Sequence, residues 1–265
     1  SRIRATLLLQ RNRPCVVVCS ARGLMTRVLD SDHMAELTHT ISADEEVDRE
    51  QFVRSLVVHG YHGVAKVEEA GTVSRRGDVI DIWPVDSRQP YRIEFFDDEI
   101  ESIRNLDPST LRSGDAVDTL RVPPAREAVP TGDGLRRLGQ HTAAMVDRLS
   151  AGQSTRRKVL QDLRQGLWFP GAEDYTAAMH PLIDVWTLAD QIIVVDSEDV
   201  AHRIAAAHGS IMDRWSGRSL VDRPPVDPAE RYSDVERVRT SLGARARSIA
   251  AIALDDAPDY QANAN

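Results

Sequence analysis

One short segment of the chain combines side chains that could bind another macromolecule. Residues 91–96 read YRIEFF, a composition typical of a β-strand. Because strand side chains alternate between the two faces of a sheet, Arg92, Glu94 and Phe96 should share one face, and the other three should face the core. Arginine forks bind carboxylates through paired hydrogen bonds, and an aromatic ring supplies apolar area. The segment therefore predicts a protein-binding face with the anchors found at interface hot spots.

The chain just before this strand adds positive charge to the same prediction. Arg75 and Arg76 end a short run that also reads as a strand. The alternative is a solvated sheet face, on which Arg92 and Glu94 compensate each other's charge and a helix covers Phe96. Alternation of residue types by itself leaves both interpretations open.

No residue pattern predicts catalysis, a metal site or a nucleotide site. A phosphate-binding loop needs Gly-Lys-Ser/Thr, and the only lysines, Lys66 and Lys158, do not stand in that context. Asp196 follows an apolar strand. We expect it to stabilise the turn into the next helix, or to cap that helix, rather than to bind Mg²⁺. His59 and His62 could share a helix face but have no third ligand nearby. We therefore predict no catalytic residue, no cofactor and no metal in this chain.

A group of short strands must position the candidate face. Alternating runs broken by Gly, Pro and Asp extend over residues 64–122, with a tight hairpin turn expected at 97–98. The expected strands are Val64–Glu68, Thr72–Arg76, Val79–Trp83, Tyr91–Phe96, Glu99–Ile103 and Leu120–Val122. A helix over 46–62, capped by Asp48, precedes them. Residues 46–128 are thus expected to form an α+β domain with an antiparallel sheet.

The flanking segments have the pattern of an α/β fold. The run Cys15–Cys19 is continuously apolar, which predicts a strand covered on both faces and buried thiols. Gln191–Val195 predicts a second continuously apolar strand, and a helix is expected over Asp199–Ala207, with Gly209 as its C-terminal stop.

The change of pattern divides the chain into three parts. Residues 1–45 and 129–265 are expected to form one α/β subdomain, interrupted by the inserted domain of residues 46–128. The returning part contains a Pro-rich loop at 223–228 and a final stretch, 255–265, that we expect to be frayed.

Composition excludes several classes of protein. The 265 residues carry 33 Lys and Arg against 41 Asp and Glu, a net charge of −8, which does not suit a general nucleic-acid coat. No apolar stretch approaches the roughly 20 residues that span a bilayer, and no signal peptide is evident. The two cysteines exclude a disulfide framework, since a strand would place them about 13 Å apart. We expect a fragment of a larger cytoplasmic protein without a membrane partner.

Two longer motifs carry a resemblance to a known family. Residues 75–84 read RRGDVIDIWP, residues 91–104 read YRIEFFDDEIESIR, and Asp107-Pro108 follow. This run resembles the UvrB-homologous module that the excision-repair protein UvrB shares with the transcription-repair coupling factors. Weaker similarity extends through residues 124–127 and 166–175. The apolar strand at 191–195 lacks the histidine of UvrB's ATPase motif, so the chain is more similar to the coupling factors.

The resemblance implies a partner and the residues that bind it. In this family the inserted domain docks UvrA, and the matching positions here are Arg76, Arg92, Glu94 and Phe96. One departure is Ser74, where UvrB forms often carry another arginine. The basic patch is therefore either reduced or restored by the neighbouring Arg75.

The resemblance also implies what the rest of the chain is. Residues 1–45 and 129–265 would form a degenerate, NTPase-like, UvrB-like subdomain. RNA polymerase and DNA are expected to bind other parts of the parent protein, whose translocase motor would use ATP and magnesium. Two rival functions stay open. The chain could be part of a UvrB-type DNA-dependent ATPase or helicase, or a structural brace for a translocase that does not contact UvrA.

Overall fold

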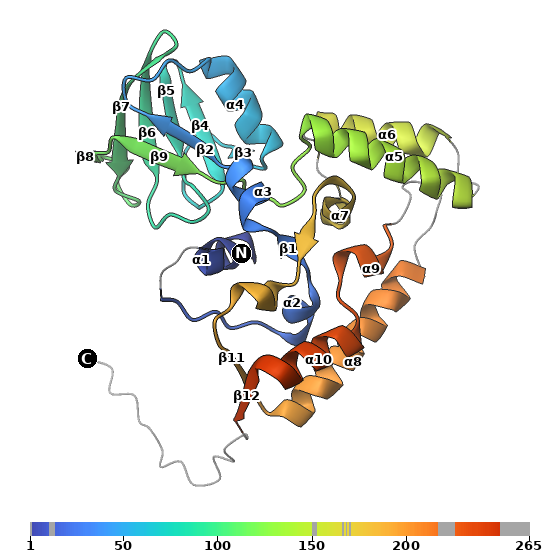
Figure 1. The fold of residues 1–265 in the computed structure, drawn as a ribbon. Coiled ribbons are helices and arrows are strands. Elements are labelled where there is room, and N and C mark those ends of the chain that lie inside the picture. The colour runs from blue at the N-terminus through green and yellow to red at the C-terminus, as the bar shows by residue number, and fades with distance from the viewer. Residues whose placement is uncertain are drawn as a thin grey trace.

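The computed structural model describes residues 2–10, 14–149, 153–165, 167, 169, 171–216 and 226–249. Over these residues it is a mixed α/β structure with four sheets, which confirms the expected fold class in its coarse form. Figure 1 shows two parts: a sheet-rich part drawn mainly in blue and green, and a mainly helical part that contains α1 and α10.

The sheet-rich part is built on six strands in the order β3-β4-β5-β6-β7-β8. All neighbours are antiparallel except β3 and β4, which run parallel. The strands are β3 (His62–Gly63), β4 (Thr72–Arg76), β5 (Val79–Ile82), β6 (Tyr91–Phe96), β7 (Glu99–Leu106) and β8 (Ser113–Ala116). A separate antiparallel pair consists of β2 (His39–Ser42) and β9 (Thr119–Val122). The antiparallel sheet expected from the sequence is therefore confirmed, and the division into an inserted domain of residues 46–128 and flanking parts stays a prediction.

Helix α4 (Arg49–Val58) covers one side of this sheet (Figure 1). It begins where the sequence indicates, because the Asp48 side chain accepts a 2.7 Å hydrogen bond from the Gln51 backbone N–H. Phe52 and Leu56, one helical turn apart, are buried on its inner face. They join inward residues of β4 to β7 and of the β2–β9 pair in one hydrophobic core.

The hairpins of the sheet depend on two residues with positive φ. Gly77 has a φ of 61° in the β4–β5 turn, and Asp97 has a φ of 57° in the β6–β7 turn. The second turn confirms the hairpin expected at 97–98. Strand β7 carries one extra residue, Glu101, opposite the Glu94–Phe95 step of β6. This bulge lets Ile100 and Ile103 both face the core although they are three residues apart.

The helical part surrounds two short sheets. Strand β1 (Val28–Leu29) pairs antiparallel with β10 (Leu182–Ile183), and β11 (Ile192–Val195) pairs parallel with β12 (Ala246–Ile249). Its helices are α1 (Arg2–Gln10), α2 (Ala21–Met25), α3 (Ser31–Glu36), α5 (Gly132–Leu149), α6 (Gln153–Arg164), α7 (Thr176–Met179), α8 (Ser197–Ser216), α9 (Pro228–Arg231) and α10 (Val235–Arg245). Two 3₁₀ turns, η1 (Ala172–Tyr175) and η2 (Val185–Leu188), complete it.

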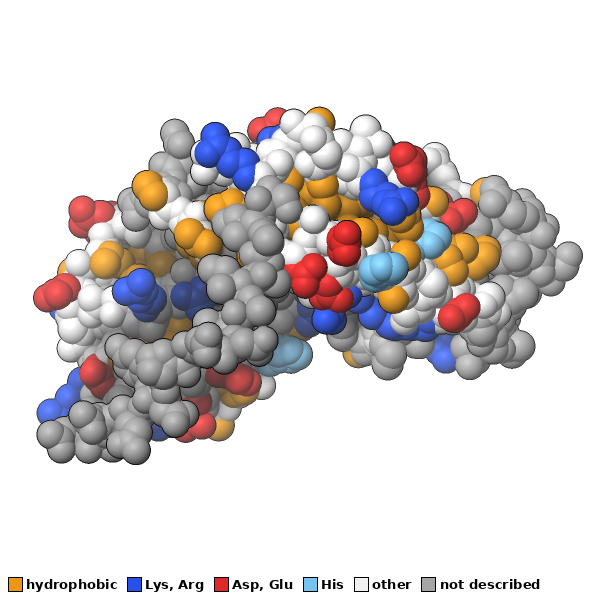
Figure 2. All heavy atoms as spheres, turned by 90° about the horizontal axis from the view of Figure 1, so that it is seen from below, with side chains coloured by type: hydrophobic (Ala, Val, Ile, Leu, Met, Phe, Trp, Pro, Cys, Tyr) orange, Lys and Arg blue, Asp and Glu red, His pale blue; other side chains and the backbone are white. Residues whose placement is uncertain are grey.

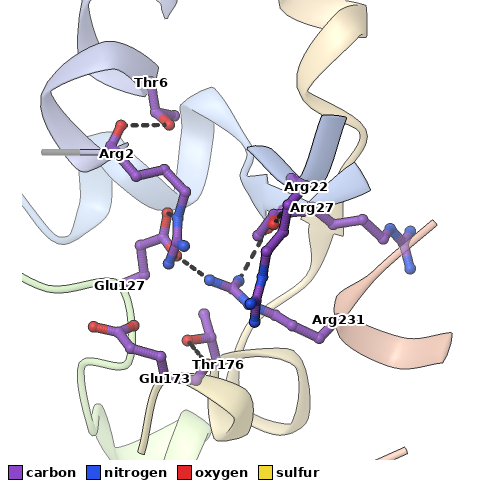
Figure 3. A network of polar contacts seen from close by, with 9 residues as sticks. Arg2, Thr6, Arg22, Arg27, Glu127, Glu173, Thr176 and Arg231 are labelled. Atoms are coloured by element: carbon purple, nitrogen blue, oxygen red, sulfur yellow. Dashed lines mark hydrogen bonds and ion pairs between the residues drawn. The ribbon is translucent and has the colours of Figure 1, made fainter. Parts of the chain in front are cut away.

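A buried ionic network lies where the chain leaves the sheet-rich part. Figure 3 shows Arg2 of α1 and Arg231 of α9 converging on Glu127, which follows β9 by five residues. Arg2 donates to Glu127 through Nε (3.1 Å) and Nη2 (2.7 Å), and Arg231 donates through Nη2. Burial by itself would raise the pKa of Glu127, but the charges of Arg231 and Arg2 outweigh it and lower the pKa. Through one carboxylate, the network therefore connects α1, the segment after β9 and α9, which are far apart in sequence.

The prediction of a buried strand at Cys15–Cys19 is wrong. Residues 14–20 have no regular secondary structure, and both cysteines are exposed. Val16 and Val18 are each 92% exposed. The apolar run has strand composition, but a strand also needs a hydrogen-bonded neighbour, and none of the described strands pairs with this segment.

Two smaller expectations also fail. Gly209 does not end its helix, since α8 continues to Ser216. A glycine costs about 1 kcal/mol in a helix interior, and α8 offsets this cost by burying Ile204 and Ile211 on one face. Residues 64–68 are irregular rather than a strand, and there the Ala65 carbonyl accepts a hydrogen bond from the Ser74 hydroxyl. Residues 223–225 and 255–265, named above as loop and frayed end, lie outside the described residues.

None of the described helices is both long enough and apolar enough to cross a membrane. On the face seen from below, acidic, basic and hydrophobic side chains of the described residues are interspersed (Figure 2).

Two stacked histidines predict a pH-dependent stability. The rings of His39 and His59 lie 4.5 Å apart between β2 and the end of α4. Burial, and then the charge of His39, lowers the pKa of His59 to about 4, and burial lowers the pKa of His39. Both folded-state values lie below the unfolded value, so the stabilising contribution is complete above pH 6.5 and is lost as the pH falls toward 4.

We expect the free energy of unfolding to fall by roughly 1–2 kcal/mol between pH 7.5 and pH 5 through His59 alone. Urea unfolding of the wild type and of His59→Leu at both pH values measures this contribution as the difference in pH dependence. His62→Gln is the matched control, because His62 is exposed on β3. Equal pH dependence in the wild type and His59→Leu would contradict the assignment.

Candidate protein-binding face

The face of the sheet opposite α4 carries the candidate binding residues. Register across the strands places Ser74, Asp81, Arg92 and Arg104 in one row, and Arg76, Val79, Glu94 and Ser102 in the next. The alternate residues of β5 and β6 are buried in the core on the other side. We call Arg76, Asp81, Arg92, Glu94, Phe96 and Arg104 the outer face.

A buried carboxylate lies at the centre of the outer face. The Asp81 side chain is 1% exposed, whereas those of Arg92 and Arg76 are 22% and 60% exposed. Arg92 donates to it twice, from Nε to Oδ1 (2.7 Å) and from Nη2 to Oδ2 (2.9 Å), and Arg76 donates from Nη2 to Oδ2 (2.9 Å). The hydrogen bond to Asp81 raises the pKa of Arg92 above its usual value. Asp81 therefore holds both guanidinium groups in place over the sheet.

Glu94 is oriented by a neighbour on β7. Its Oε2 accepts a 2.7 Å hydrogen bond from the Ser102 hydroxyl, directly across the strand pair. The side chain is half-buried, which limits its freedom to follow a partner. Glu94 is thus a fixed acceptor beside the arginine pair.

Phe96 is the most exposed aromatic ring of the face. It is 74% exposed at the end of β6, just before the turn at Asp97. The alternative in which a helix covers this ring is therefore wrong. Burial of an exposed ring against a partner stabilises the complex by about 25 cal/mol per Å² of apolar area removed from water. Phe96 lies on the same face as Arg92, four residues further along β6, and its role as the apolar anchor of an interface stays a prediction.

Arg75 does not belong to the outer face. It lies opposite Ile80 on the side of α4, where its guanidinium pairs with Glu50 of that helix. The hydrogen bond to Glu50 raises the pKa of Arg75. The suggestion that Arg75 restores the charge missing at Ser74 is therefore wrong, and Ser74 itself is buried. Arg104 on β7 lies in the same cross-strand row as Ser74, and its side chain is exposed.

The structure brings the four residues expected from the sequence, Arg76, Arg92, Glu94 and Phe96, to one face, and their role in binding stays a prediction. Sequence reasoning missed Asp81, although alternation along β5 carries the signal. Ile80 and Ile82 face the core, so Asp81 between them must point outward. Among the residues that the structure describes, no group of three His, Cys, Asp or Glu is arranged to hold a metal.

Comparisons with known proteins match the sheet-rich part to a domain family and most of the chain to curated relatives. Residues 40–127 match the family model of the UvrB interaction domain. A transcription-repair-coupling factor of Myxococcus xanthus is 33% identical over 240 residues, 86% of this chain. That of Haemophilus influenzae is 26% identical over 247 residues, 91% of this chain. That of Staphylococcus haemolyticus is 30% identical over 166 residues, 63% of this chain.

The chain is homologous to part of the transcription-repair-coupling factors. It spans about one fifth or less of the length of these three relatives, 20%, 21% and 14% respectively. The residues that match the UvrB interaction domain include every residue of the outer face and end at Glu127, the centre of the ionic network.

Proposed function

We propose that the outer face recruits UvrA and thereby links stalled RNA polymerase to nucleotide excision repair. The observation that carries the proposal is the grouping of one exposed aromatic ring with two guanidinium groups ordered by a buried carboxylate. This arrangement suits a partner surface with an apolar pocket flanked by acidic side chains. The match of residues 40–127 to the UvrB interaction domain supports the same partner.

The remaining parts of the proposal concern the parent protein. The α/β segments on either side of the inserted domain would form a degenerate, NTPase-like subdomain. RNA polymerase, DNA, ATP and magnesium would be bound by other parts of a longer cytoplasmic protein. Within this chain Lys66 pairs with Glu68, and Asp196 accepts a hydrogen bond from the Asp199 backbone N–H at the start of α8. These contacts support structural roles rather than a role in nucleotide binding.

Calorimetric titration of the purified chain with purified UvrA tests the proposal. We expect saturable binding that weakens with salt, because charged groups contribute to the face. Absence of binding, with the chain shown to be folded by circular dichroism, would favour the structural brace. Binding of a fluorescent ATP analogue by the chain alone would favour the UvrB-type ATPase.

A further inference from the structure

Asp81 is almost completely buried, and acidic side chains are rarely so buried unless they are paired. Its carboxylate lies on the outer side of β5, under the two arginine side chains that it binds. A buried ion pair contributes little net stability, because desolvation of the charges offsets their attraction, and apolar residues often replace such a pair without loss. Stability therefore gives no strong reason for a carboxylate at this site.

The geometry gives Asp81 a different role. Arg92 uses its Nε and Nη2 groups on Asp81, which leaves Nη1 without a partner among the described residues. Arg76 uses only Nη2 and is mostly exposed. The two-point contact fixes the plane of the Arg92 guanidinium group and the single contact restrains that of Arg76, while both keep N–H groups that Asp81 does not use. Ordering before binding lowers the conformational entropy that a long side chain loses in an interface.

We propose that Asp81 is a positioning residue, which fixes the guanidinium groups of Arg76 and Arg92 so that they present paired donors to carboxylates of the partner. The inference rests on the proposed function, because it concerns the same face. It goes further by naming the residue that orders this face and the acidic chemistry of the surface that binds it.

Asp81→Asn separates positioning from simple charge. The substitution makes the outer face more positive by one unit, so attraction by charge alone would strengthen binding to an acidic partner. Positioning predicts the opposite, since an amide replaces only part of the bidentate acceptor. We expect the affinity for UvrA to fall about tenfold, measured by calorimetry. Asp115→Asn on the exposed strand β8 is the matched control, with the same charge change and unchanged affinity expected.

Two further measurements make the test decisive. In an Arg76→Ala/Arg92→Ala background, Asp81→Asn should have no further effect on affinity, because Asp81 acts through these two residues. Arg92→Lys keeps the charge but loses the fork, and it should weaken binding about as much as Arg92→Ala. Arg92→Lys changes only a partly exposed side chain, so it reports on the inference even if Asp81→Asn does not fold.

The Nε–H resonance of Arg92 gives a readout that does not depend on UvrA. It should be resolved and slow to exchange in the wild type and lost in Asp81→Asn. Unchanged or stronger UvrA binding by folded Asp81→Asn would overturn the inference, as would a rapidly exchanging Arg92 Nε–H in the wild type; if Asp81→Asn does not fold, unchanged binding by Arg92→Lys would overturn it. If the wild type does not bind UvrA, the proposed function fails, and the resonance still decides whether Asp81 orders the arginine.

Discussion

Substituting Glu127 by alanine should lower the free energy of unfolding by about 3–5 kcal/mol. Glu127 and Arg231 are each 2% exposed, and the carboxylate is the only anion that Arg231 contacts through a hydrogen bond among the described residues. Without it, Arg231 keeps a hydrogen bond to the Arg27 carbonyl (3.0 Å) but stays charged and buried. A buried charge left without its counter-ion is among the largest single-residue destabilisations known.

Urea unfolding at pH 7.5 measures this prediction. Glu68→Ala is the matched control: it removes a carboxylate from an exposed ion pair with Lys66, and we expect a change of less than about 1 kcal/mol. Glu173 lies close to the network, where burial and then the charge of Glu127 raise its pKa. Glu127→Ala removes one of the causes that raise the pKa of Glu173 and leaves Glu173 as a nearby carboxyl for Arg231, which places the expected loss nearer the lower end of the range. A loss below 1 kcal/mol would mean that Glu127 is not the anchor of the network.

The candidate face is the part of the structure that follows most directly from local sequence. Alternation along one strand is enough to place Arg92, Glu94 and Phe96 on the same side, and it requires no knowledge of neighbouring strands. The burial of Asp81 cannot be obtained in this way. It depends on the cross-strand register that sets Asp81 opposite Arg92, and register is a property of the assembled sheet.

Long-range partners explain the remaining differences. Cys15–Cys19 has strand composition, but whether such a run forms a strand depends on a neighbour that its own residues do not specify. Arg75 differs from Arg76 because α4 places Glu50 within reach of one and not the other. In the ionic network, Arg2 and Glu127 are 125 positions apart in sequence, and Glu127 and Arg231 are 104 positions apart. No local sequence pattern can therefore predict these contacts.

Replacing Phe96 by alanine should weaken UvrA binding at least tenfold, about 1.4 kcal/mol or more. The ring is exposed in the free protein, so its removal takes little from the core, and the free energy of unfolding should change by less than about 0.5 kcal/mol. The loss of affinity comes from apolar area that the complex would otherwise remove from water. Calorimetric titration with UvrA gives the affinity, and urea unfolding of the same variant gives the stability.

Val57→Ala provides a matched control within the same domain. Val57 is also an exposed apolar residue, but it belongs to α4, which packs on the side of the sheet opposite the outer face. If Phe96 acts as an interface anchor, only Phe96→Ala should weaken binding, because apolar area matters at the contact and not elsewhere on the surface. Equal affinities for the wild type and Phe96→Ala would remove the apolar anchor from the proposed interface. Equal losses in Phe96→Ala and Val57→Ala would show that the effect is not specific to the outer face.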